Sequence, residues 1–153
     1  MSYITGMDLT RIDTTAEFTL GGLGQTSDGK VYKYVKYEEA TAATAGVAGE
    51  VAYYATVAVG DATGTIVTSD LSDSDEVGAG VLQAALTDGT FGWVQVGGIA
   101  TLTIALTAGA DGDVLTPTGA TDGTLDVTAA ATSAPCAIAI DASAKIIMCD
   151  FIR

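Results

Sequence analysis

The sequence predicts an all-β protein, a single antiparallel β-sandwich or barrel-like domain with an extended N-terminal arm. Runs of β-branched and aromatic residues recur from Val31 onward, which is typical of short strands. Asp-Gly dipeptides, which favour tight turns, separate such runs at Asp28, Asp88, Asp111 and Asp122. The length of 153 residues suits one domain with one core.

The chain divides into an arm or lead-in at residues 1–30 and a β domain at residues 31–153. The arm mixes polar residues with isolated apolar ones and sustains neither a helical nor a strand period. Its end, "GGLGQTSDG", is typical of a loop. We therefore expect residues 1–20 to be available for contact with a partner and to be unnecessary for folding.

The first predicted strand is "KVYKYVKY", Lys30 to Tyr37. Alternation places Tyr32 and Tyr34 on one face and Val31, Val35 and Tyr37 on the other. Further strands are expected in the runs "EVAYYATVAV", "TGTIVTS", "AGVLQAAL", "FGWVQV", "ATLTIAL", "TLDVTAA", "CAIAI" and "KIIMCDFI".

The only tryptophan, Trp93, lies in "FGWVQV" on the same side of its strand as Phe91. Two large aromatic side chains on one strand face anchor either a core or a subunit interface. The core is the more common use, and we expect it here.

The last two runs predict a hairpin that turns at "DASA". Pairing Ile140 with Lys145 would set Cys136 opposite Cys149, on a core face shared with Ile138 and Ile147. Two buried thiols in a protein made in a reducing cytoplasm are more often apolar fillers than a disulfide. We therefore expect facing, buried and reduced cysteines.

The last strand is apolar on both faces. Its odd-numbered side chains form one face, and Ile146, Met148 and Ile152 form the other. Such a strand is either central in a sandwich or covered by a partner, so the pattern predicts a homo-oligomer, with a trimer as first choice.

The net charge of −13 argues against nucleic acid and anionic membrane as partners. No lysine or arginine occurs between Tyr37 and Ala144, a span with 14 acids. The start of the chain lacks a basic region followed by an apolar run, and no apolar stretch is long enough for a membrane helix. Synthesis in a cytoplasm is expected.

Composition and motifs argue against an enzyme. The chain has no histidine, no nucleophile elbow and no phosphate-binding loop. The acidic loop with Asp70, Asp73, Asp75 and Glu76 lacks the spacing of a calcium loop, so we expect a solvated loop there. We expect the same of Asp111 and Asp113. We expect no catalytic residue, no cofactor and no metal.

Candidate partner-binding residues come from the arm and from the lysines of the first strand. In that strand Lys30 and Lys36 share one face, and the lysine between them takes the other. These lysines either protect an edge strand or form salt bridges to an acidic partner. The candidates are Tyr3, Ile4, Met7, Leu9, Ile12, Phe18, Leu20, Lys30, Lys33 and Lys36.

Three segments follow one another in a recognisable order: "FTLGGLGQTSDGKVYKYVKYEEATAATAGVAGEVAYYA", "GVLQAALTDGTFGWVQVGGIATL" and the tail from Asp111, together about residues 17–153. This order of motifs resembles that of the small decoration, or cement, proteins of tailed-bacteriophage heads. The resemblance implies a virion protein, made in the host cytoplasm, that binds the major capsid protein on the outer capsid surface. It also implies bridging of neighbouring capsomers, often as a trimer.

Other functions stay open at this point. The chain could be a carbohydrate-binding module, which would need clustered exposed aromatic side chains. It could be a structural module of a fibre or surface layer, which internal repeats would favour. A small hydrolase would need carboxylates in a cleft.

Overall fold

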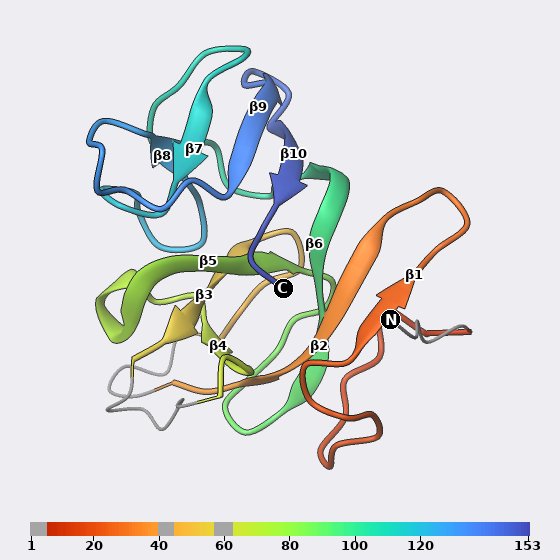
Figure 1. Ribbon diagram of the computed structural model, residues 1–153. Helices are drawn as coiled ribbons and strands as arrows, with labels where there is room; N and C mark the ends of the chain where they lie inside the picture. The colour runs from red at the N-terminus through yellow and green to blue at the C-terminus, as the bar shows by residue number, and fades with distance from the viewer. Residues whose placement is uncertain (1–5, 40–44, 57–62) are drawn as a thin grey trace.

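The computed structural model describes residues 6–39, 45–56 and 63–153, and in this part of the chain the fold is all-β, as the sequence predicts (Figure 1). No helix among these residues is long and apolar enough to cross a membrane. The strands, with one 3-10 helix η2 (Leu71–Asp73), are β1 (Leu23–Gln25), β2 (Val31–Tyr37), β3 (Val51–Ala55), β4 (Ile66–Thr68), β5 (Ser74–Leu82), β6 (Phe91–Thr101), β7 (Val114–Thr116), β8 (Asp126–Val127), β9 (Ala137–Asp141) and β10 (Ile146–Asp150).

Five strands form a closed ring of pairings. β2 pairs with β4, β4 with β3, β3 with β5, β5 with β6, and β6 pairs back with β2. The β2–β4 pair is parallel and the other four are antiparallel. From β6 the sheet continues through β10, β9 and β7 to β8, the upper part of Figure 1. Closing a sheet on itself removes exposed strand edges.

The two parts of the sheet share one main core. Val35, Val51 and Val94 from the ring belong to the same buried cluster as Leu115 and Ile147 from the outer strands. A second, smaller cluster lies on the other face of β2 and consists of Tyr32, Tyr34 and Trp93. The predicted alternation of the first strand is therefore confirmed, and the tryptophan belongs to a core.

The Asp-Gly turns are also confirmed. Gly29, Gly89, Gly112 and Gly123 all have a positive φ, between 72° and 89°. A side chain is strained in this left-handed region, which explains glycine after each of the four aspartates.

One strand prediction was wrong. "FGWVQV" and "ATLTIAL" were expected to be two strands, but β6 runs without a break from Phe91 to Thr101. Gly97 and Gly98 lie inside it, and Gly98 takes a φ of 89°. Most of the second run lies beyond the end of the strand. Glycine allows a strand to bend and continue as well as to stop.

The C-terminal hairpin exists, but its predicted register was wrong by one residue. Lys145 has a φ of 60° and belongs to the turn, and Ile146 pairs with Asp141, two residues from the predicted register. An irregularity between Ile146 and Ile147 then leaves the rest of the ladder one residue from that register, with Cys149 opposite Ala137, so the two cysteines do not face each other directly. Because side chains alternate, this shift turns Ile138 and Ile140 outward and buries Ala137 and Ala139.

The segment expected to be an arm takes part in the sheet at its C-terminal end. β1 lies within residues 1–30 and pairs with β2 in antiparallel register, with Leu23 opposite Lys33. The residues before β1 contain no strand among those described, apart from one isolated bridge at Asp13.

Candidate functional site

Residues 6–20 form a strap that lies along β2 and β6. Asp13 makes an isolated antiparallel bridge to Phe91, the first residue of β6. The Asp13 amide donates to the Phe91 carbonyl at 3.0 Å, and the Phe91 amide donates to the Asp13 carbonyl at 2.9 Å. The middle of the strap is thus held to the sheet by backbone contacts.

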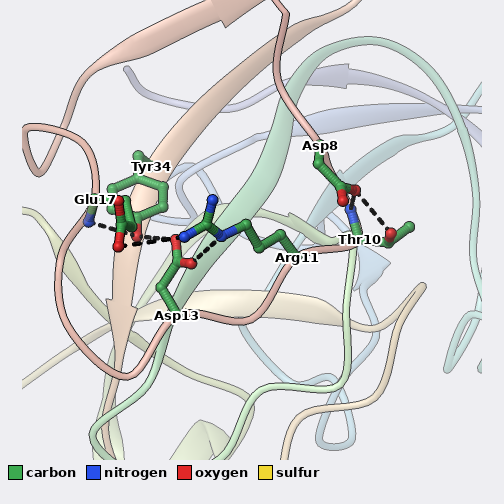
Figure 2. A network of polar contacts seen from close by, with 6 residues as sticks. All are labelled: Asp8, Thr10, Arg11, Asp13, Glu17 and Tyr34. Atoms are coloured by element: carbon green, nitrogen blue, oxygen red, sulfur yellow. Dashed lines mark hydrogen bonds and ion pairs between the residues drawn. The ribbon is translucent and has the colours of Figure 1, made fainter.

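A network of polar side chains locks the same point (Figure 2). Asp13 is buried, and its Oδ2 accepts a hydrogen bond of 2.6 Å from Tyr34 Oη. Its Oδ1 forms an ion pair with Nε of Arg11, whose Nη2 lies 3.2 Å from Glu17 Oε1. The Glu17 amide donates to Tyr34 Oη at 3.3 Å. A buried carboxylate is costly unless it is paired in this way, so the network favours one strap position.

Burial and the hydrogen bond to Asp13 raise the pKa of Tyr34 to about 12. The phenol therefore stays neutral at physiological pH and keeps its proton for donation to the Asp13 carboxylate.

Phe18 of the strap packs into an aromatic cluster with Tyr34, Phe91 and Trp93. The Phe18 ring centroid lies 5.2 Å from that of Tyr34 and 5.3 Å from that of Trp93. Tyr34 and Trp93 lie opposite each other on β2 and β6, with ring centroids 5.1 Å apart. These separations are typical of favourable edge-on and tilted ring pairs.

The structure places the candidate residues of the strap in two groups. Met7, Leu9, Phe18 and Leu20 pack against the second core cluster and are half-buried. Ile12 points away from the core, and 46% of it is exposed. The remaining arm candidates, Tyr3 and Ile4, lie outside the described residues.

The three lysines of the first strand differ in environment. Lys33 is buried, and its Nζ donates to Tyr54 Oη at 2.9 Å and to the Gly64 carbonyl at 2.8 Å. Lys36 pairs with Glu38, and Lys30 Nζ lies 3.7 Å from Asp28 Oδ2. The Lys33 ammonium group therefore forms its hydrogen bonds inside the protein. Of the three lysines, only Lys30 and Lys36 remain candidates for contact with a partner.

The segment predicted as an acidic loop is instead mostly regular, because Asp73 ends η2 and Asp75 and Glu76 lie in β5. Its first aspartate has a structural role. Asp70 Oδ1 accepts a hydrogen bond of 2.8 Å from the Ser72 amide and so caps η2. Asp122 Oδ1 accepts a hydrogen bond of 2.9 Å from the Leu71 amide in the same turn. In residues 6–39, 45–56 and 63–153 no three histidine, cysteine, aspartate or glutamate side chains gather as metal ligands would.

The outer face of the last strand, which the sequence singled out, belongs to an apolar row across four strands that the sequence did not predict. Met148 of β10 is paired with Ile99 of β6 on one side and with Ile138 of β9 on the other, and Ile138 is paired with Val114 of β7. Their exposed fractions are 41% for Ile99, 44% for Met148, 40% for Ile138 and 43% for Val114. The row forms only in the observed register of the hairpin. In the sequence, the apolar outer face of the last strand was the feature that pointed to it.

Comparisons with protein families, with curated proteins and with solved structures find no match for this chain.

Proposed function

We propose that the chain is a structural protein of a tailed-phage head, a decoration protein that binds the major capsid protein on the outer surface of the shell. Each copy bridges neighbouring capsomers, and the assembled state is stabilised because the protein binds it in preference to separated subunits. The resemblance in motif order supports this function, and the all-β fold is compatible with it.

The observation that carries the proposal is the locked strap with Ile12 on its outside. A buried, paired carboxylate at Asp13 holds the strap, yet the neighbouring apolar side chain faces solvent. A segment held in one position before binding loses little conformational entropy on docking. The strap therefore offers a preformed apolar contact, and we propose it as the shell-binding element together with Lys30 and Lys36.

Attachment as a homo-oligomer, with a trimer as first choice, would multiply weak contacts with the shell. Once one copy of a trimer is bound, the others meet their sites at a high effective concentration. A modest contact at each strap can then give lasting retention on the particle.

The proposal is tested on purified heads of the virus that encodes the chain. Ile12→Asp should reduce retention of the protein on heads that sediment, because a charge replaces the apolar contact. Val47→Asp is the matched control, since Val47 is also 46% exposed but lies outside the strap. Equal retention of the two variants would rule out the strap as the contact.

Electron cryo-microscopy of the same particles tests the function itself. Density for the chain that bridges capsomers on the head is expected. Density confined to a tail, a fibre or a cell surface layer would overturn the proposal and favour one of the other structural functions.

A further inference from the structure

A pocket lies beside the pairing of β5 with β6. Its volume is about 440 Å³, within the range of about 300–1,000 Å³ that is typical of small-molecule sites. The two strands supply most of the lining, and Lys30 and the turn at residues 48–49 complete it. The pocket therefore has the size of a ligand site, and its polar groups indicate which ligand it suits.

Gln95 is the buried polar residue of this lining, with 3% of it exposed. Its Nε2 donates to the Ile99 carbonyl at 2.9 Å and to the Gly97 carbonyl at 3.2 Å, so both amide hydrogens are used. The reverse orientation would set Oε1 against two carbonyl oxygens, so the two contacts fix the direction of the amide. Among the described residues no donor reaches Oε1. A buried acceptor costs free energy until a donor meets it, and a ligand in the pocket can supply that donor.

Gln83 presents a second carboxamide to the same pocket. Its Nε2 donates to the Val81 carbonyl at 2.9 Å, which leaves its Oε1 for a further contact. Val81 is the cross-strand partner of Gln95, and the Gln83 amide donates to the Trp93 carbonyl at 3.1 Å. The two glutamines therefore come from adjacent segments of the sheet, and both offer an acceptor oxygen to one ligand.

The rest of the lining adds donors and apolar surface. Lys30 Nζ lies 3.7 Å from Asp28 Oδ2, too far for a hydrogen bond, so its N–H groups are not committed to that acid. Thr101 is exposed, and its hydroxyl can donate and accept. Val81 and Leu82 supply apolar surface. Among the described residues no acid lines the pocket, although the chain has 19 acids.

We propose that this pocket binds a sugar ring. Sugar hydroxyls donate to the oxygens of Gln83 and Gln95 and accept from the Lys30 ammonium group, while the C–H groups of the ring pack against Val81. Other classes of small ligand meet these groups less well. A hydrocarbon leaves Gln95 Oε1 unpaired, a carboxylate or phosphate sets its own lone pairs against the glutamine oxygens, and an amine brings a positive charge toward Lys30.

A peptide strand fits the pocket less well than a sugar does. A peptide that extends a sheet needs unpaired backbone groups. Here the Leu82 amide donates to the Glu50 carbonyl at 2.8 Å, and the Leu82 carbonyl accepts from the Gly49 amide at 2.8 Å. The Gln83 amide is also paired. Recognition at this point is thus left to side chains. The inference does not rest on shell binding, and the free protein tests it without any particle.

Nuclear magnetic resonance of labelled protein locates the ligand directly. The chain has three glutamines and no asparagine, so the side-chain amide region of the spectrum holds three pairs of signals. Glucose, galactose, mannose and N-acetylglucosamine are titrated singly. At least one should shift the signals of Gln83 and Gln95 with a dissociation constant of about 1 mM. Gln25, exposed in β1, is the internal control and should not shift.

Two variants remove one acceptor each, and a third is the matched control. Gln83→Ala and Gln95→Met should each raise the dissociation constant about tenfold, the loss expected for one hydrogen bond. Gln25→Ala should bind as the wild type does. Circular dichroism and melting show which variants are folded. If Gln95→Met does not fold, the half-buried Gln83 decides the matter through Gln83→Ala.

The same ring can come from a free sugar or from a glycan chain, and calorimetry with disaccharides distinguishes the two sources. Tighter binding of a disaccharide than of its component sugars indicates a glycan chain, and weaker binding indicates a free sugar; both results support the site. No shift with any of the four sugars at about ten times 1 mM would overturn the proposal. Wild-type affinity in the folded glutamine variants would also overturn it, as would shifts of Gln83 and Gln95 that appear only when capsid protein is added.

Discussion

Tyr34 donates a 2.6 Å hydrogen bond to Asp13, 21 positions earlier in the chain, and both residues are buried. This contact ties the strap to the centre of β2. It joins a segment without a regular strand to the strand that carries Tyr32 and Tyr34 of the second core. Several properties of the protein can be predicted from it.

Replacing the donor should destabilise the protein. Tyr34→Phe keeps the ring but leaves Asp13 Oδ2 without its hydrogen bond, which should lower the free energy of unfolding by about 1–3 kcal/mol. Chemical denaturation measures this change. Thr10→Ala is the control, because Thr10 Oγ1 bonds the exposed Asp8 at the surface and its loss should cost little. Equal losses of unfolding free energy in the two variants would show that the buried hydrogen bond stabilises the fold no more than the exposed one.

Removal of the strap should also destabilise the chain, contrary to the expectation from sequence. Deleting residues 1–20 uncovers Tyr34 and Trp93, and each lost Phe18 ring contact is worth about 0.5–1.5 kcal/mol. The melting temperature should fall, and the fluorescence of Trp93 should shift to longer wavelength. Ile12→Asp should leave both properties unchanged. A truncated protein with wild-type melting would restore the expectation of a dispensable arm.

Alkaline pH should weaken the fold. The pKa of Tyr34 is raised from 10.0 to about 12, so below pH 10 the phenol is neutral in both folded and unfolded chains and its contribution is fully present. Between about pH 10 and pH 12 the unfolded chain ionises first, and the free energy of unfolding falls. Denaturation at a series of pH values measures this fall, which Tyr34→Phe should reduce. An unchanged slope in the variant would contradict the assignment.

The two thiols should be unreactive in the native protein. Cys136 and Cys149 are buried and unbonded, so the expectation of buried, reduced cysteines is confirmed even though their facing register is not. Burial raises the pKa of Cys149 to about 12 and also raises that of Cys136. A thiol reagent should find no reactive group at neutral pH and two after unfolding. Rapid reaction of the folded protein would show that this part of the core opens.

A methyl group at Gly78 should be costly. A Cβ there would lie 2.8 Å from Cys136 Sγ and from two ring carbons of Phe151, closer than such atoms pack. Gly78→Ala should lower the free energy of unfolding by about 1–3 kcal/mol. Gly97→Ala is the control, because the nearest atom to its Cβ is Arg153 Nη2 at 3.3 Å, the far end of a long side chain that can shift. A larger loss from the control would contradict the packing argument.

Much of the fold could be predicted from the sequence, because local patterns decide it. The alternation of Tyr32, Tyr34 and Val35 indicates which side of β2 faces each core. Each Asp-Gly pair predicts a turn. These signals come from neighbouring residues and need no knowledge of distant contacts.

The candidate surfaces could not be predicted in the same way, because they depend on distant pairings. The strap has no periodicity, and Asp13 finds Tyr34 only after folding. The outward position of Ile138 follows from an irregularity between Ile146 and Ile147, which leaves the rest of the ladder one residue away from the predicted register. A one-residue change of register moves every side chain to the opposite face, so small local differences decide what a surface displays.

The pairing of β2 with β6 has a consequence for synthesis on the ribosome. β2 ends at Tyr37, and its antiparallel partner begins only at Phe91. At about 5–20 residues per second, roughly 3–10 s separate the appearance of the two strands. During this interval an aromatic strand is without its main partner and is exposed to aggregation. The ring can close only after β6 has been made, so we expect slow folding that is completed late in translation or after it.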